Sequence, residues 1–275
     1  MKYPWVDNPT LWKDSITTGF AVLAGIETFL AISSISLNCV WDKYNWIIKL
    51  LFVLVLFVLI VITIFLIKWG NAKKGVTIKI RGITVNVMPG DIFKANGWKV
   101  IAFNEYFDTT VDDKIIAHNT LNGIFIDRHI EDIDDLCKAI DADDKSSTLK
   151  RSKKGERWVY PLGRIITYKD YMLLALTHID KENNAHLSQK DYEDCLRIMW
   201  KEICRTYANK PIFLPLLGSG ITRFDGTPHK LKFDLLKCIL CTLRTSGENI
   251  NQPITILLTE EAMQEINIYE IKGVK

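Results

Sequence analysis

The chain has 275 residues, of which 48% are hydrophobic and 24% are charged, and its net charge is +3. This composition is ordinary for a globular protein of one or two domains. The charge is too small to indicate a nucleic-acid partner, and the basic residues are not interleaved with aromatic residues as in single-strand binders. The 6 cysteines show no disulfide framework and fit a reducing compartment. Cys238 and Cys241 form a CxxC pair inside an expected helix, without a closely spaced histidine pair, so we expect no metal site.

The most apolar part of the chain is residues 50–67, which contain no charged residue and one polar residue, Thr63. With the flanking Trp46 and Trp69, this segment is long enough to cross a hydrocarbon core of about 30 Å. The segment leaves no face for water, which argues against a buried helix of a soluble protein. It begins far from the N-terminus and is followed directly by Lys68, which argues against a cleaved signal peptide. We therefore expect a transmembrane helix over residues 46–69.

Residues 16–40 form a second apolar segment, which is interrupted by polar residues including Glu27, Ser34 and Asn38. At about 100° per residue these three side chains fall on one side of a helix. An ionisable group within a membrane helix is costly, so this polar stripe is a candidate oligomer contact or the lining of a watery path. The alternative is an amphipathic helix that lies on the membrane surface.

Together the two segments predict a helical hairpin that crosses the membrane twice, with residues 41–45 as its turn. Lys and Arg are denser directly after Ile67 than in this turn, so the positive-inside rule places both termini in the cytoplasm. Residues 70–75, GNAKKG, are the expected boundary. The chain thus divides into a membrane region of residues 1–69, a short linker, and a cytoplasmic domain of residues 76–275.

From residue 76 onward, strand-like and helix-like patterns alternate, which predicts an α/β fold with helices on the faces of a sheet. An acidic stretch at residues 131–144 and a basic stretch at residues 145–157 are most simply a solvated helix and a surface hairpin. The expected strands are residues 76–80, 83–87, 99–103, 165–168, 172–176, 211–216 and 254–258, and the expected helices are residues 130–140, 189–207, 228–243 and 260–266.

Residues 211–226, PIFLPLLGSGITRFDG, indicate a buried strand that runs into a glycine loop. Gly218 and Gly220 allow the chain to bring its N–H groups close to a ligand, and the next helix N-terminus favours negative charge. That helix is expected to begin near Thr227 and Pro228, with Thr227 as its N-cap. The segment therefore predicts a site for a nucleotide-like phosphate. The inward stripe of the helix is expected to be Leu231, Leu235, Ile239 and Thr242.

Two motifs resemble those of macro domains, the α/β modules that bind ADP-ribose. The first is residues 87–92, VMPGDI, similar to a Gly-Asp-Ile segment after an early strand. The second is residues 218–221, GSGI, similar to the macro phosphate loop and about 125 residues further on. The resemblance implies a macro-like three-layer α/β/α domain with a mixed sheet. Its implied ligand is ADP-ribose or a derivative.

The resemblance also implies roles for individual residues. Asp91 would accept a hydrogen bond from the adenine amino group, with the Ile92 amide beside it, because an ionised carboxylate is an acceptor only. Phe224 would pack on a ribose or a ring. The structural alternatives are that Asp91 caps the turn ahead of Phe93 and that Phe224 belongs to the core. The diphosphate would be held by the amides of Gly218, Ser219, Gly220 and Ile221.

The other macro loop departs from the family pattern. Enzymatic members have Asn-Ala-Ala-Asn followed by glycines after a strand, whereas this chain has IAFNEYF at residues 101–107. Residues 119–125, NTLNGIF, are similar to the substitute loop of divergent macro proteins, which makes Asn122 and Gly123 the candidates for a second phosphate clamp. Asn104 is placed to reach a distal ribose. We therefore expect a sensor without catalytic residues, metal or further cofactor.

The layout of two membrane helices followed by a divergent macro domain resembles the membrane effectors of type II Thoeris antiphage systems. This resemblance implies that a partner TIR-domain enzyme makes an ADP-ribose-derived signal, histidine–ADP-ribose. It implies further that the macro domain senses this signal, and that the membrane helices then form homo-oligomers and damage the bacterial inner membrane, an abortive-infection response.

Two other functions remain open from the sequence. A membrane-anchored ADP-ribosyl hydrolase needs a residue that activates water beside the distal ribose, for which the chain offers Asn104, Asp108 and Asp112. A plain membrane tether would dock ADP-ribosylated proteins without harming the membrane.

Overall fold

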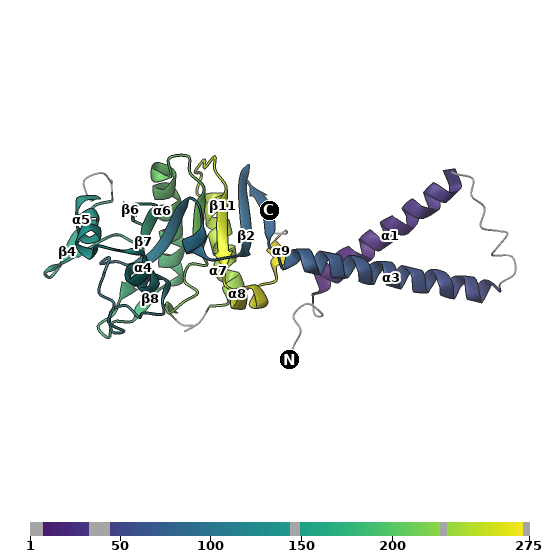
Figure 1. Ribbon diagram of the computed structural model, residues 1–275, viewed down its shortest axis with the longest axis horizontal. Helices are drawn as coiled ribbons and strands as arrows, with labels where there is room; N and C mark the ends of the chain where they lie inside the picture. Colours follow the sequence, from purple (N-terminus) through teal and green to yellow (C-terminus); the bar gives the residue numbers. More distant parts are fainter. Residues whose placement is uncertain (1–7, 33–44, 144–148, 226–229, 272–275) are drawn as a thin grey trace. The chain divides into compact units, whose positions relative to one another are not determined.

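The computed structural model describes residues 8–32, 45–143, 149–225 and 230–271 (Figure 1). It divides into two compact units. The first unit comprises residues 1–75 together with residues 267–270, and the second comprises residues 76–266 together with residues 271–275. The chain therefore passes between the units three times, after Gly75, after Ile266 and after Glu270.

Two long helices, α1 (Pro9–Ile32) and α3 (Trp46–Ala72), form most of the first unit. α1 begins earlier than the expected residues 16–40, because the Asn8 side chain accepts a hydrogen bond from the Leu11 amide at 3.0 Å and caps the helix. α3 covers the expected residues 46–69 and continues to Ala72, so the expected linker is helical in its first half. In the expected polar stripe Glu27 is exposed on α1, whereas Ser34 and Asn38 lie outside the described residues.

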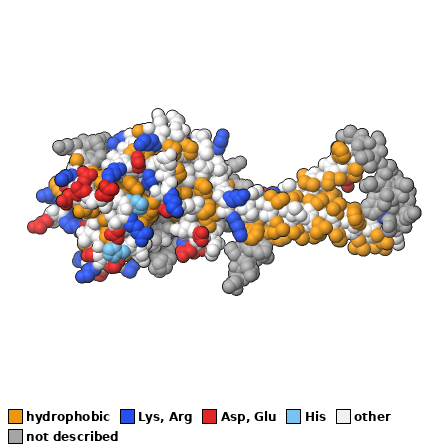
Figure 2. All heavy atoms as spheres, viewed as in Figure 1, with side chains coloured by type: hydrophobic (Ala, Val, Ile, Leu, Met, Phe, Trp, Pro, Cys, Tyr) orange, Lys and Arg blue, Asp and Glu red, His pale blue; other side chains and the backbone are white. Residues whose placement is uncertain are grey.

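Of the described helices, α3 alone is long and apolar enough to cross a membrane, with a mean hydropathy of 3.6 over its most apolar window. At 1.5 Å per residue, its 27 residues extend about 40 Å. Its outward side chains are hydrophobic along most of its length (Figure 2). α1 does not meet the same criterion. The two-helix transmembrane hairpin therefore remains a prediction.

α1 and α3 pack against each other through small and aromatic side chains. The rings of Trp12 and Phe65 stack with their centroids 4.2 Å apart. Ser15 is fully buried, and a Cβ atom placed on Gly19 would lie 2.8 Å from Cγ2 of Val61. Small residues at these positions therefore permit the close approach of the two helices.

A mixed sheet of nine strands is the centre of the second unit, in the order β1-β2-β11-β9-β3-β7-β8-β10, with β6 also paired to β7. β11 runs parallel to β2 and β9, and β3 runs parallel to β9 and β7. β1 pairs antiparallel with β2, and both β6 and β8 pair antiparallel with β7, whereas β10 runs parallel to β8. The bounds are β1 (Val76–Ile80), β2 (Ile83–Pro89), β3 (Trp98–Asn104), β6 (Ile165–Tyr168), β7 (Tyr171–Ile179), β8 (Ala185–Leu187), β9 (Ile212–Pro215), β10 (Arg223–Phe224) and β11 (Ile254–Leu258).

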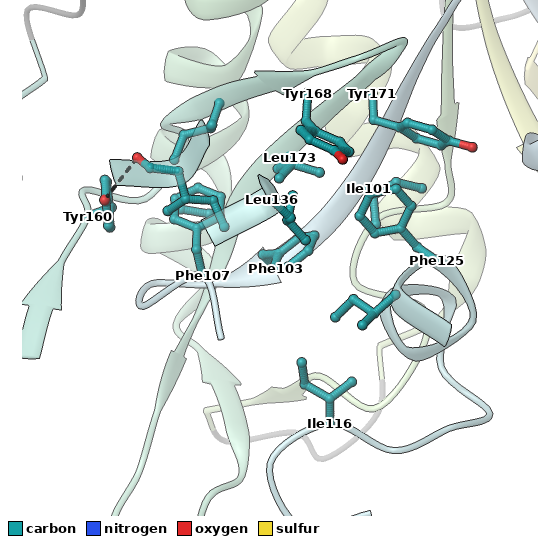
Figure 3. Close-up of a cluster of buried hydrophobic side chains, with 14 of the residues drawn as sticks. Ile101, Phe103, Phe107, Ile116, Phe125, Leu136, Tyr160, Tyr168, Tyr171 and Leu173 are labelled. Carbon is teal, nitrogen blue, oxygen red and sulfur yellow. Dashed lines mark hydrogen bonds between the residues drawn. The ribbon is translucent and has the colours of Figure 1, made fainter. Parts of the chain in front are cut away.

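Helices cover both faces of this sheet, since β7 is buried at every position from Tyr171 to Thr177. α4 (Leu121–His129) and α5 (Ile133–Asp143) bring Phe125 and Leu136 against Phe103 and its neighbours (Figure 3). α6 (Gln189–Thr206) and α7 (Lys232–Thr245) pack together, and the Trp200 indole donates a hydrogen bond to Thr242 at 3.2 Å. The remaining elements are η1 (Ile92–Lys94), α8 (Glu260–Glu265), α9 (Ile268–Ile271) and the hairpin of β4 (Ser152–Lys154) and β5 (Arg157–Val159).

The expected α/β fold with a mixed sheet is confirmed, and seven expected strands are present as β1, β2, β3, β6, β7, β9 and β11. The expected hairpin between residues 145 and 157 is the β4–β5 pair, displaced by a few residues. The short strands β8 and β10 were not expected. They pair with each other over two residues, which gives the sequence no room to show an alternating pattern.

One helix was not expected, and another begins later than expected. Residues 119–125 were expected to be a loop, but α4 begins at Leu121 because Thr120 caps it, accepting a hydrogen bond from the Gly123 amide at 3.0 Å. The helix expected from Pro228 begins at Lys232, and residues 226–229 lie outside the described residues. Leu231, expected to face inward, is 74% exposed, whereas the rest of its expected stripe is buried.

Candidate functional site

A cavity of about 1000 Å³ lies at the carboxyl ends of the parallel strands. Loops that follow such strand ends are where open α/β sheets bind ligands. The cavity is lined by residues that follow β2, β3, β9 and β11 and by the first turn of α4. Of the expected site residues, those on its wall are Asp91, Ile92, Asn104, Asn122, Gly218, Ser219, Gly220 and Ile221. Segments that are far apart in the sequence thus meet at one site.

Asp91 lies directly after β2 and begins the η1 turn. Its Oδ1 accepts a hydrogen bond from the Phe93 amide at 3.0 Å, so the structural alternative considered for this residue is present. The second carboxylate oxygen is 3.9 Å from the Lys94 ammonium group, and the Asp91 side chain is 47% exposed. One oxygen therefore holds the turn, while the other is placed to accept a hydrogen bond from a ligand.

The glycine loop after β9 turns sharply at Gly218, where φ is +79°. Ser219 stabilises the turn, because both its amide and its hydroxyl donate to the Leu216 carbonyl, at 3.2 and 2.6 Å. Gly220 has open space where a side chain would stand. The loop therefore leaves room at Gly220 for a ligand to approach the backbone closely.

Asn122 and Gly123 lie in the first turn of α4 and differ in their placement. Asn122 lines the cavity, and its buried Oδ1 has no hydrogen-bond partner among the described residues. Leaving such an atom unsatisfied costs about 1–3 kcal/mol, which favours a role in binding. Gly123 is not on the cavity wall. A Cβ there would lie 2.3 Å from the Ala117 carbonyl oxygen, so this glycine is required for packing.

Asn104 reaches the cavity wall at the end of β3, but its side chain is largely engaged. Its Oδ1 accepts from the Tyr106 amide at 3.0 Å, and its Nδ2 donates to Asp108 at 2.9 Å. Asp108 also pairs with Arg157. Asp112 accepts from the amides of Lys114 and Ile115, which lower the pKa of its carboxyl group. The two carboxylates considered for hydrolysis thus both have partners inside the protein.

Phe224 lies behind the glycine loop. It is buried, is not part of the cavity wall, and meets the Tyr192 ring edge-on at 5.5 Å. Its Cζ would lie 3.2 Å from a Cβ at Gly218. In this structure Phe224 therefore supports the loop from the core.

Sequence reasoning missed an aromatic pair on the cavity wall. The rings of Phe93 and His129 stack with centroids 4.1 Å apart and planes inclined by 12°. His129 is in the last turn of α4, and because no helix was expected there, no sequence signal placed it opposite Phe93. Thr259 and Ala262, at the start of α8, were missed for a different reason: the helix was expected, but only the sheet order, which brings β11 beside β2, places it at the cavity.

An ion pair bridges the ends of β3 and β7. Nδ1 of His178 lies 2.6 Å from Oε2 of Glu105. This hydrogen bond raises the pKa of His178 despite the opposing effect of burial. Burial by itself raises the pKa of Glu105, but the hydrogen bond and charge of His178 outweigh it and the net pKa shift is downward. The pair fixes the strand ends beside Asn104.

These observations define an α/β ligand-binding module in which a glycine loop and a carboxylate after an early strand face one cavity. Comparison with known proteins identifies which module it is. Residues 85–259 match the family model described as Thoeris protein ThsA, Macro domain. The chain is also 35% identical over 271 residues to the Thoeris protein ThsA of Bacillus amyloliquefaciens (strain Y2), covering 95% of this chain and 88% of that protein. The chain belongs to the ThsA macro-domain family.

Solved structures of the Oceanobacillus iheyensis macrodomain are among the structural neighbours. A point mutant with ADPR has a TM-score of 0.49 at 14% identity, covering 72% of this chain and 96% of that chain. The same macrodomain with ADP has a TM-score of 0.47 at 14% identity, covering 72% of this chain and 94% of that chain.

Proposed function

We propose that this chain is a membrane effector of antiphage defence whose macro domain senses an ADP-ribose-derived nucleotide. The observation that carries the proposal is the shared cavity of about 1000 Å³, which brings Asp91 and the Gly218–Ile221 loop together on one wall. A dinucleotide-sized ligand needs a carboxylate or amide for its base and several N–H groups for its diphosphate, and these two segments supply both.

In the proposed complex Oδ2 of Asp91, which does not hold the turn, accepts a hydrogen bond from the adenine amino group, next to the Ile92 amide. The amides of Gly220 and Ile221 hold the diphosphate, and Ser219 shapes their loop. The buried Oδ1 of Asn122 accepts a hydrogen bond from a ribose hydroxyl, so that this otherwise unsatisfied atom gains a partner. Asn104 and Gly123 position the wall, and Phe224 supports the loop.

The proposed ligand is ADP-ribose bearing a further group, histidine–ADP-ribose by resemblance, made by a partner TIR-domain enzyme. The proposed output is self-association of the membrane helices and damage to the inner membrane, with both termini in the cytoplasm. Ligand binding can shift the equilibrium from the resting to the assembled state only as far as the ligand binds the assembled state more tightly than the resting state. Hydrolysis is not part of the proposal, since Asp108 and Asp112 are engaged within the protein.

Calorimetric titration of the full chain in lipid nanodiscs with ADP-ribose and with histidine–ADP-ribose tests the proposal. Asp91→Asn is the informative variant, because its single amide oxygen can still accept from the Phe93 amide but no carboxylate oxygen remains for adenine. A hydrogen bond to a charged group contributes about 1.5–3 kcal/mol, so we expect Kd to rise about 10- to 100-fold.

Asp170→Asn is the matched control, because Asp170 is a surface carboxylate away from the cavity wall and pairs with Lys210 at 3.4 Å. It is expected to bind both ligands as the parent chain does. If neither nucleotide binds the parent chain, the proposed function is wrong. If both bind but Asp91→Asn has no effect, the assignment of Asp91 to adenine is wrong.

A further inference from the structure

The segment of residues 267–270 is attached to the helices of the first unit. Nδ2 of Asn8 donates to Oδ1 of Asn267 at 2.7 Å. The Tyr269 hydroxyl donates to the Asp14 carboxylate at 2.8 Å. Tyr269 is 8% exposed and packs in a cluster with Leu11 of α1 and Phe65 of α3. A segment near the end of the chain is thus bound by both hydrogen bonds and apolar contacts.

The segment binds where α1 and α3 are held together. The Lys68 ammonium group of α3 donates to the Asp14 carbonyl at 3.0 Å and to the Thr18 hydroxyl at 2.8 Å. Asp14 therefore bonds to α3 through its main chain and to Tyr269 through its side chain. Burial, followed by the hydrogen bond to Asp14, raises the pKa of Tyr269 to about 12, so its hydroxyl remains a donor across the physiological range.

The residues just before this segment line the ligand cavity. Thr259 and Ala262 are on the cavity wall, and the Thr259 hydroxyl caps α8 by accepting from the Ala262 amide at 3.2 Å. α8 packs against β2 and β11. Ile266 follows α8, donates its amide to the Ala262 carbonyl at 2.9 Å, and is directly bonded to Asn267. Only four residues separate Ala262 on the cavity wall from Asn267 in the first unit.

We propose that residues 259–270 form a coupling strap that transmits ligand binding from the cavity to the base of α1 and α3. This inference rests on the proposed function for its ligand and goes beyond it by naming the path. The path is short, and its ends are fixed by hydrogen bonds in different units. A displacement of Thr259 and Ala262 on the cavity wall is transmitted through α8 and then through the Tyr269 ring to Asp14. Linkage makes the effect reciprocal, so that breaking the contact at Asp14 also loosens the cavity wall.

Hydrogen exchange of the full chain in lipid nanodiscs tests the strap without any ligand. Tyr269→Phe and Asp14→Ala remove the same hydrogen bond from opposite sides. Since one hydrogen bond contributes about 1 kcal/mol, we expect exchange in residues 259–265 to become about fivefold faster in each variant. Asp14→Asn keeps an oxygen that accepts from Tyr269 and is expected to exchange at the parent rate. Tyr106→Phe, at a hydroxyl with no hydrogen bond among the described residues, is the control for loss of a phenol.

Unchanged exchange of residues 259–265 in Asp14→Ala overturns the strap, whether or not a nucleotide binds. A second arm adds ADP-ribose, followed by calorimetry. The strap predicts that ADP-ribose alters exchange in residues 8–18 of the parent chain and that Tyr269→Phe abolishes this effect although the variant still binds ADP-ribose. If ADP-ribose binds and both chains respond alike at residues 8–18, the strap is wrong and the proposed function stands. If ADP-ribose and histidine–ADP-ribose both fail to bind, the proposed function is wrong, and the ligand-free arm alone decides on the strap.

Discussion

Gly218 and Gly220 belong to the same loop but have different surroundings. At Gly218 the backbone has a φ of +79°, and a Cβ would lie 3.2 Å from Phe224 and 3.4 Å from Tyr192. At Gly220 the corresponding position is open. Gly218 is therefore required for the conformation and packing of the loop, whereas Gly220 leaves space that a ligand can occupy.

Alanine substitutions at the two positions are expected to separate stability from binding. Gly218→Ala should lower the free energy of unfolding by about 1 kcal/mol or more, because alanine resists the left-handed conformation. Gly220→Ala should leave stability within about 0.5 kcal/mol but weaken ADP-ribose binding, since its methyl group stands between the loop amides and the diphosphate. Chemical denaturation and titration measure the two effects. Unchanged affinity in Gly220→Ala would show that the loop amides do not contact the ligand.

The Glu105–His178 pair predicts a specific pH dependence of stability. The pKa of His178 is raised above 6.5, so its contribution is complete below about pH 6.5 and is lost as the pH rises through the raised pKa. The pKa of Glu105 is lowered from 4.5, so on the acid side the contribution is lost only as the pH falls through that lower pKa. Asp191 favours the charged form of His178, and Lys154 opposes it.

Glu105→Gln is therefore expected to destabilise the protein by about 1 kcal/mol at pH 6 and by progressively less above pH 7. Thermal unfolding at several pH values measures this. The control is Asp127→Asn, because the pair between Asp127 and His118 has the same 2.6 Å separation but lies on the surface, with His118 55% exposed. If the thermal stability of Glu105→Gln changes with pH in parallel with that of the parent chain between pH 6 and 8, the Glu105–His178 pair does not contribute to stability as described.

At the scale of elements, the contact between α1 and α3 depends on the small residues of α1. Gly19 lies against α3, whereas Gly25 has nothing within 4 Å of the position its side chain would occupy. Gly19→Leu should push the helices apart, because the added side chain meets Val61 and Phe57. Gly25→Leu should leave their spacing unchanged.

Spin labels on the exposed residues Thr17 and Ile62 would report this spacing in nanodiscs. A longer and broader distance distribution is expected for Gly19→Leu alone. The same distribution in both variants would mean that α1 and α3 are not in contact in the membrane.

The sequence predicted elements well where the signal was local and long. The strands β1, β6 and β11 have the expected bounds, and α6 differs from its expected range by one residue. The prediction from sequence failed for α4 and for the start of α7. Asn122 and Gly123 are turn formers by type, but Thr120 caps a helix over them. Thr227 and Pro228 are good helix starters by type, but α7 begins after Leu231, whose side chain stays exposed.

At the scale of the whole molecule, the chain returns to its starting unit. It leaves the first unit at Gly75, builds the sheet, and re-enters through residues 267–270, which bind Asn8 and Asp14. The two units are therefore connected along the chain after Gly75, after Ile266 and again after Glu270. The connection at Ile266 lies within the proposed strap of residues 259–270.

The amino-acid sequence alone determined the apolar helix α3, the alternation of strands and helices, and the two motifs that place Asp91 and Gly218 at strand ends. These features depend on neighbouring residues and on hydrophobic periodicity, which one chain displays directly. Only the tertiary structure decided that Phe224 lies in the core, that Asn104 is bound to Asp108, and that Tyr269 reaches Asp14. The last contact joins residues more than 250 positions apart, and the Phe224 contact depends on how a loop and a distant helix pack. Such choices follow from packing and from the pairing of polar groups in three dimensions, for which the sequence has no local pattern.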